Sequence, residues 1–179
     1  FNRDKGFSVT VYKNTKIGNA SSSDFRDDSI NKTVQAAFEI ARYTSQDEFA
    51  GLADTDQLEK KNIDLDLYHS WDYDINETIE LAKECESSAL NFDKKIKNTE
   101  GANVSTNHST FVYGNTNGFL KGYPSSIHSL GCGVIAEDKG EMQRDYWWST
   151  SRLRGGLEKS IDVGELAGSR AVKRLKSRT

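Results

Sequence analysis

Hydrophobic and polar residues alternate near the start of the chain in the way that a half-buried β-strand requires. Phe7, Val9 and Val11 are separated by single polar residues, which places them on one face of an extended segment. After a polar connection at residues 13–16, a second extended segment runs from Ile17 to Ser23. The two segments predict an antiparallel β-hairpin.

Beyond the hairpin the spacing of apolar residues becomes helical. Up to about Tyr43, apolar side chains recur three or four residues apart, at Ile30, Val34, Ala37 and Ala41. Ser23 or Asp24 can accept hydrogen bonds from the free N–H groups of the first helical turn. We expect this helix to bury its apolar stripe on the hairpin.

The periodicity is lost between Thr44 and Tyr73, which predicts a long connection. The segment contains scattered acidic residues and three isolated apolar anchors, Leu65, Leu67 and Trp71. A connection of this length is typical of a boundary between two packing units. We therefore expect one unit at 1–60 and a second at 61–179.

Helical spacing returns at Asp74, where Glu77 stands three residues later in a capping-box arrangement. The apolar stripe of this second helix consists of Ile75, Ile79, Ala82, Cys85 and Ala89. Four strand candidates follow, at 96–105, 110–115, 118–136 and 141–150. A last helix is predicted from Asp162, with an apolar stripe at Val163, Leu166, Ala167, Ala171 and Leu175.

These elements predict an α+β fold. A β-hairpin and a helix come first, followed by a helix, an antiparallel four-stranded meander and a final helix. Gly164 and Gly168 lower the stability of the last helix by about 1 kcal/mol each relative to Ala unless they allow close packing.

Two glycines distinguish the longest strand candidate. Alternate residues from Leu130 to Ala136 are apolar and share one face, while Gly131 and Gly133 leave the other face without side chains. Another backbone, either a peptide or a partner strand, could lie close against that face. An equally good interpretation is that the glycines relieve twist or form a bulge.

Composition and charge exclude some classes of function. The 179 residues include 24 Lys and Arg against 27 Asp and Glu, so the net charge of −3 supplies no general attraction to nucleic acid or anionic membranes. No stretch of 18 apolar residues and no signal-peptide pattern occurs, and the mean hydropathy is −0.71. We expect a folded, cytoplasmic protein without a membrane segment.

The sequence contains no recognisable catalytic or metal-binding motif. His69, His108 and His128 are too far apart to place two ligands on one helical face, and each is interpreted as a structural or surface residue. His128 and Cys132 lie about 13 Å apart if they share a strand, too far for proton transfer, so Cys132 is interpreted as a core residue. We predict no catalytic residue, no metal ligand and no cofactor in this chain.

Aromatic and basic residues near the C-terminal end suggest two kinds of binding. Tyr146, Trp147 and Trp148 put aromatic rings on both faces of one strand, where they could stack nucleic-acid bases or fill the core and meet a partner. The net negative charge favours the second interpretation. A run of five cations could bind phosphates or form a solvated helix end, at Arg170, Lys173, Arg174, Lys176 and Arg178.

Several sequence blocks occur in a characteristic order. They are IARYT at 40–44, FAGLAD at 49–54, DLYHSW at 66–71, NTEGA at 98–102, GYPSSIHSL at 122–130, IAE at 135–137 and MQRDY at 142–146. In this order they resemble the TldD/PmbA family and specifically its PmbA (TldE) branch. The blocks extend over almost the whole chain, although none encodes a mechanism by itself.

The resemblance implies a cytosolic bacterial subunit that pairs with a TldD-like partner in a zinc peptidase acting on leader or unfolded peptides. In this family the zinc ligands belong to the TldD branch, in a His-Glu-x-x-x-His helix that is absent here. Family members are more than twice this length. The resemblance thus implies that 1–60 ends the first α/β domain, that 61–179 belongs to the central α+β domain and that a C-terminal domain is missing.

These observations lead to one hypothesis and one rival. The hypothesis is a non-catalytic subunit region that contacts an extended peptide or the TldD-like partner through Gly131, Gly133, Tyr146 and Trp148. The rival is a DNA gyrase-associated or nucleic-acid-binding module, because the family has also been named a modulator of DNA gyrase.

Overall fold

A computed structural model describes residues 2–72 and 74–175. The elements follow the order β1, β2, α1, α2, β3, β4, β5, the short 3-10 helix η1 and α3. The chain divides into two compact units. The first contains the chain up to Lys61 together with Gly114–Leu120, and the second contains Asn62–Tyr113 and the chain from Lys121 onward.

The first unit contains the predicted hairpin and helix. β1 (Phe7–Lys13) pairs antiparallel with β2 (Lys16–Ser22) across a two-residue turn. Asn14 and Thr15 in that turn both have positive φ, as the type I′ geometry requires. The expectation of a hairpin is confirmed.

Helix α1 (Asp27–Tyr43) packs on β2 at very short range. A Cβ at Gly18 would lie 2.0 Å from the carbonyl oxygen of Ala37 and 2.4 Å from the amide nitrogen of Ala41. Both alanines are buried, as the predicted stripe requires. The predicted cap is displaced: the helix begins after Arg26, whose side chain makes no cap, and the Asp24 carboxylate accepts from both the amide and the guanidinium of Arg26.

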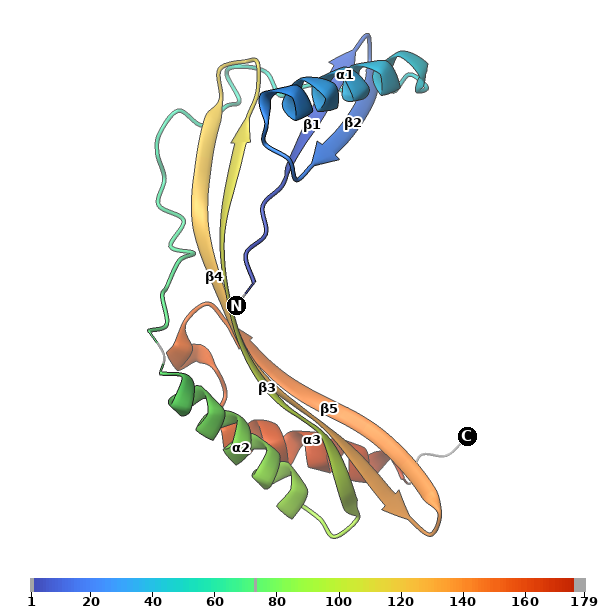
Figure 1. Cartoon of the computed structure of the whole chain (residues 1–179), viewed down its shortest axis with the longest axis vertical. Helices are drawn as coiled ribbons and strands as arrows, with labels where there is room; N and C mark the ends of the chain where they lie inside the picture. Colours follow the sequence, from blue (N-terminus) through green and yellow to red (C-terminus); the bar gives the residue numbers. More distant parts are fainter. Residues whose placement is uncertain (1, 73, 176–179) are drawn as a thin grey trace. The chain divides into compact units, whose positions relative to one another are not determined.

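The second unit contains a three-stranded antiparallel sheet with two helices on one face (Figure 1). The strands are β3 (Ile96–Gly114), β4 (Leu120–Asp138) and β5 (Glu141–Ser151), in the order β3-β4-β5. Helices α2 (Ile75–Asn91) and α3 (Ser160–Arg174) pack against each other, and η1 (Arg154–Gly156) lies between β5 and α3.

The α+β class is confirmed, but the meander has three strands rather than four. The first two strand candidates form the single strand β3, because the polar residues between them stay paired with β4. The Thr106 hydroxyl lies 3.3 Å from Nδ1 of His128, and Ser109 bonds to Ser125 at 2.8 Å. Polar residues in a strand with polar cross-strand neighbours resemble a turn in sequence, although they need no break in the ladder.

Two other boundaries differ from the sequence prediction. The β4–β5 turn has two residues, Lys139 and Gly140, both at positive φ, so β4 extends to Asp138 rather than ending at the predicted residue 136. Helix α3 begins at Ser160, two residues before the predicted Asp162. Asp74 does cap α2 by accepting from the amide of Asn76 at 3.0 Å. The Glu77 side chain, however, pairs with Arg154 rather than returning a bond to the cap.

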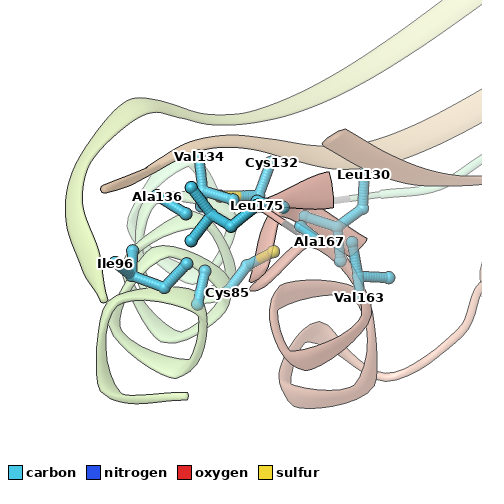
Figure 2. Close-up of a cluster of buried hydrophobic side chains, with 11 residues drawn as sticks. Cys85, Ile96, Leu130, Cys132, Val134, Ala136, Val163, Ala167 and Leu175 are labelled. Atoms are coloured by element: carbon cyan, nitrogen blue, oxygen red, sulfur yellow. The ribbon is translucent and has the colours of Figure 1, made fainter. Parts of the chain in front are cut away.

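The core of the second unit lies between the sheet and its two helices, and Figure 2 shows its side chains at close range. It consists of Cys85, Ala89, Ile96, Leu130, Cys132, Val134, Ala136, Val163, Ala167, Ala171 and Leu175. Cys132 is 3% exposed, which confirms its interpretation as a core residue. Its thiol interacts with that of Cys85, and this interaction together with burial raises the pKa of Cys85. The small residues of α2 and α3 allow the helices to approach closely.

A segment of the predicted connection is bound to the inner face of the β3–β4 ribbon. The amide of Ser126 donates to the carbonyl of Leu67 at 2.9 Å, and the amide of His69 donates to the Ser126 hydroxyl at 2.9 Å. Trp71 is 5% exposed and packs edge-on against the His128 ring. We call residues 67–71 the strap, because they cover the inner face of β4 beyond the helices.

Asp145 on β5 forms ion pairs with two arginines of α3. Its carboxylate is almost fully buried and lies 3.3 Å from Arg170 and 3.4 Å from Arg174. Burial acts to raise the pKa of Asp145. The Tyr146 amide and the two guanidinium groups outweigh this effect and hold the pKa below its ordinary value.

We expect Asp145→Asn to lower the free energy of unfolding by about 2 kcal/mol at pH 7, because it removes the charge that pairs with two guanidinium groups. The loss is not larger because both guanidinium groups are half exposed and stay hydrated. A depressed folded-state pKa stabilises the fold above the unfolded value of 3.8, and this stabilisation is lost as the pH falls further. The difference in free energy of unfolding between wild type and variant, measured by urea denaturation, should therefore be smaller at pH 3 than at pH 7.

Glu100→Gln is the matched control, because it removes one carboxylate from an exposed ion pair with Arg144 on the same sheet. We expect it to change the stability by less than about 1 kcal/mol. If Asp145→Asn lowers the free energy of unfolding equally at pH 7 and pH 3, the carboxylate of Asp145 does not stabilise the fold through its charge.

Candidate functional site

The sheet of the second unit has one face turned away from α2 and α3, and we call it the open face. Alternate residues of β4 from Leu130 to Ala136 point into the core, so Gly131 and Gly133 lie on the open face. Register places Trp148 opposite Gly131 and Tyr146 opposite Gly133. All four residues predicted from sequence to bind a partner or a peptide thus lie together on the open face.

The two aromatic side chains form an exposed platform on β5. The rings of Tyr146 and Trp148 are stacked with centroids 5.1 Å apart and an interplanar angle of 26°. Each is about half exposed. Trp147 between them points to the other face, where its indole nitrogen lies 3.2 Å from Glu158 and Arg170 covers its ring. Trp147 therefore packs inside the fold, and Tyr146 and Trp148 remain accessible on the open face.

The glycines are needed where they stand, for two different reasons. A Cβ at Gly131 would lie 3.0 Å from the Cβ of Trp148 and 3.3 Å from the carbonyl oxygen of Trp147. A Cβ at Gly133 would lie 2.9 Å from the carboxylate of Glu100, a flexible side chain that can move. Gly131 thus sets the position of the platform, and Gly133 makes room for the Glu100 side chain that lies against it.

β4 is the central strand, and this limits how a peptide can bind near the glycines. Its hydrogen-bonding edges are occupied by β3 and, from His128 to Asp138, by β5. An added strand could pair with the outer edge of β5 or β3, whereas at Gly131 and Gly133 a ligand must lie across the face. The charged groups beside these glycines neutralise each other, since Arg144 pairs with Glu100 at 2.7 Å.

The three histidines do not form one site. His128 is fully buried, and its two ring nitrogens face the Thr106 hydroxyl at 3.3 Å and the carbonyl of His69 at 3.0 Å. The His69 ring contacts Asp66, and the His108 ring packs edge-on against Tyr68. Within 2–72 and 74–175, no group of three or more His, Cys, Asp or Glu residues is placed to hold a metal ion.

Two residues of the C-terminal basic run form ion pairs within the second unit. Arg170 and Arg174 bind Asp145, while Lys176 and Arg178 lie outside the described residues. Arg152 and Arg154 are also engaged, since Arg152 donates to the carbonyl of Ser126 at 3.2 Å and Arg154 pairs with Glu77. No helix within the described ranges has the length and apolar character needed to cross a membrane.

Sequence reasoning missed a second aromatic pair on the open face. Tyr123 lies eight residues before Gly131 on β4 and therefore points to the same side. Its ring lies 5.7 Å from that of Phe111 on β3. Both aromatic residues are evident in the sequence, but nothing there shows that they are neighbours. Their contact follows only from the register between β3 and β4.

Comparison with known proteins places both halves of the chain in one family. Residues 68–177 match the PmbA/TldA metallopeptidase central domain, and residues 1–41 match domain 1 of the same proteins. The metalloprotease PmbA of Escherichia coli O157:H7 is 43% identical over 178 residues, covering 99% of this chain and 40% of that protein. A PmbA homologue of Haemophilus influenzae is 39% identical over 175 residues, covering 98% and 39%.

Solved structures show the same fold. A candidate modulator of DNA gyrase from Bacteroides thetaiotaomicron superposes with a TM-score of 0.82 at 23% identity, over 97% of this chain and 40% of that one. TldE from Thermococcus kodakarensis gives 0.60 at 15% identity, over 93% and 36%. The chain spans about 40% of the length of the curated relatives that it matches. It belongs to the PmbA/TldD metallopeptidase family.

Proposed function

We propose that this chain is a non-catalytic, cytosolic part of a PmbA/TldE-type subunit. In the proposal, the subunit works with a TldD-like partner that cleaves leader or unfolded peptides, and the open face contacts the peptide. The observation that carries the proposal is the convergence of Gly131, Gly133, Tyr146 and Trp148 on that face. Exposed aromatic rings on the face of a sheet suit a polypeptide ligand, because they give contact area at low entropic cost.

The proposal assigns zinc to the TldD-like partner. The only fully buried histidine of this chain, among those described, uses its ring nitrogens to hold Thr106 and the strap. His69 and His108 are engaged with other neighbours. The residues described do not fit a zinc site, so no catalytic step is derived from them.

A reconstitution assay tests the proposal. A TldD-like subunit is mixed with a labelled unfolded peptide, with and without the full-length protein that contains this chain. Cleavage should require both proteins, and the Tyr146→Ser/Trp148→Ser variant should lower the rate about tenfold, as loss of two aromatic anchors does at other interfaces. Leu166→Ser removes an exposed apolar side chain from α3 and should leave the rate unchanged.

Two outcomes would overturn the proposal. One is equal cleavage with and without the protein, and the other is an unchanged rate in a folded Tyr146→Ser/Trp148→Ser variant. Gly131→Val is a poorer probe, because its Cβ would press on the β5 backbone and disturb the strand as well as the surface.

The second candidate is a gyrase-associated or nucleic-acid-binding module. It is supported by the descriptions of two structural neighbours, from Bacteroides thetaiotaomicron and Thermotoga maritima, as candidate modulators of DNA gyrase. Binding to single-stranded DNA should then weaken steeply with salt, since each neutralised phosphate adds to the log–log slope. No binding at low salt would exclude the nucleic-acid form of this candidate.

A further inference from the structure

The open face extends well beyond the four residues of the candidate site. β5 pairs with β4 only from His128 to Asp138, so the first part of β4 has β3 as its only neighbour in the sheet. The strap lies at the other edge of β4, where the Leu67 carbonyl accepts from the Ser126 amide, and reaches the inner face at His69. On the outer face, Phe111 is 55% exposed and Tyr123 is 36% exposed. Two-stranded ribbons are marginally stable alone, so exposed rings here favour an interaction surface.

The surface between the two aromatic pairs carries small and uncharged side chains. Serine side chains point to the open face here, and they bond to one another or to a neighbouring strand, as Ser109 does to Ser125 and Ser129 to Thr150. Ile127, which is 42% exposed, adds one apolar side chain. These small residues leave room for a main chain lying along β4. The paired hydroxyl groups and the Arg144–Glu100 ion pair offer no net charge to a ligand.

The separation of the two pairs fixes the length of a ligand that contacts both. Tyr123 and Gly131 are eight residues apart on one strand, which corresponds to about 27 Å. An extended polypeptide advances by the same rise per residue, so it also needs eight residues to join the pairs. An even spacing puts both of its anchoring side chains on one face.

We propose that Phe111 and Tyr123 form a second anchor on the open face, which together with Tyr146 and Trp148 binds an extended, uncharged polypeptide segment of at least nine residues. Apolar side chains eight positions apart occupy the two anchors, and the main chain lies over the serine-lined surface between them. The proposal rests on the proposed function for the first anchor, but the second anchor has its own observations and its own test.

The test uses capped, labelled ten-residue peptides of Ser, Thr and Gly, and measures their binding to this chain by fluorescence anisotropy. One peptide has Phe at positions 1 and 9, a second has Phe at positions 1 and 5, and a third has Phe at position 1 only. The first should bind about tenfold or more tightly than the other two, since the second contact becomes intramolecular. Equal affinity of the three peptides for the wild-type chain would overturn the proposal without requiring any variant.

Variants separate the two anchors. Phe111→Ser/Tyr123→Ser should reduce the 1,9 peptide to the affinity of the single-Phe peptide, while Tyr123→Phe should retain the advantage. Leu166→Ser on α3 is the control and should change nothing. If Tyr146→Ser/Trp148→Ser weakens binding but Phe111→Ser/Tyr123→Ser does not, the second anchor is wrong and the proposed function stands. If sedimentation shows that a second copy of the chain covers Phe111 and Tyr123, the proposal is also wrong.

Discussion

Gly164→Ala should destabilise the second unit by about 3 kcal/mol, although alanine is the better helix former by about 1 kcal/mol. A Cβ at Gly164 would lie 2.2 Å from the carbonyl oxygen of Cys85 and 2.9 Å from the amide nitrogen of Ala89. Both atoms belong to the α2 backbone, which cannot yield without moving the helix. The free energy of unfolding in urea measures the effect.

Gly168→Ala in the same helix is the matched control. Its Cβ would lie 2.8 Å from the Cβ of Phe92, which caps the C-terminal end of α2, so the contact falls on the end of that helix rather than on backbone within it. We therefore expect a change within about 1 kcal/mol, since the gain in helix propensity offsets the crowding. Equal effects of the two substitutions would contradict a backbone-to-backbone contact between α2 and α3 at Gly164.

His128→Ala should cost about 3 kcal/mol of stability and release the strap. The substitution leaves a cavity at a fully buried position and removes the partner of the His69 carbonyl. Trp71, which packs on the His128 ring, should become more exposed, so its fluorescence should shift to the red. Hydrogen exchange of residues 67–71 should speed up more than that of α3.

The matched control for this prediction is His108→Ala. His108 is exposed and packs edge-on against the rings of Tyr68 and His128 without a hydrogen bond to either ring, so its loss should cost less than about 1 kcal/mol. An unchanged exchange rate in the strap of the His128→Ala variant would show that other contacts hold the strap.

The class of the fold could be predicted because local patterns determine it. Alternation predicted the hairpin, and helical spacing predicted α1, α2 and α3. The glycines of α3 were also interpretable, since their only sequence rationale was close packing, and Gly164 does contact the α2 backbone. In each case neighbours along the chain supply the decisive information.

The strap and the second anchor could not be predicted because their partners are distant in sequence. His69 and His128 are 59 residues apart, and no periodicity marks residues 67–71 as more than a connection. The number of strands was wrong for a related reason, because Thr106 to Ser109 look like a turn until their partners on β4 are known. For the candidate site, the four residues were chosen from sequence, but their convergence depends on the β4–β5 register.

Photo-crosslinking tests most directly whether the open face binds a polypeptide. The peptide with aromatic residues at positions 1 and 9 is made with a benzophenone side chain at one of these positions, irradiated with the chain, and the products are mapped by mass spectrometry. We predict crosslinks concentrated on β4 and β5 around Gly131, Gly133, Tyr146 and Trp148, and on the Phe111–Tyr123 pair. Crosslinks confined to the outer surfaces of α2 and α3, or none above those of a peptide lacking both aromatic residues, would contradict the account.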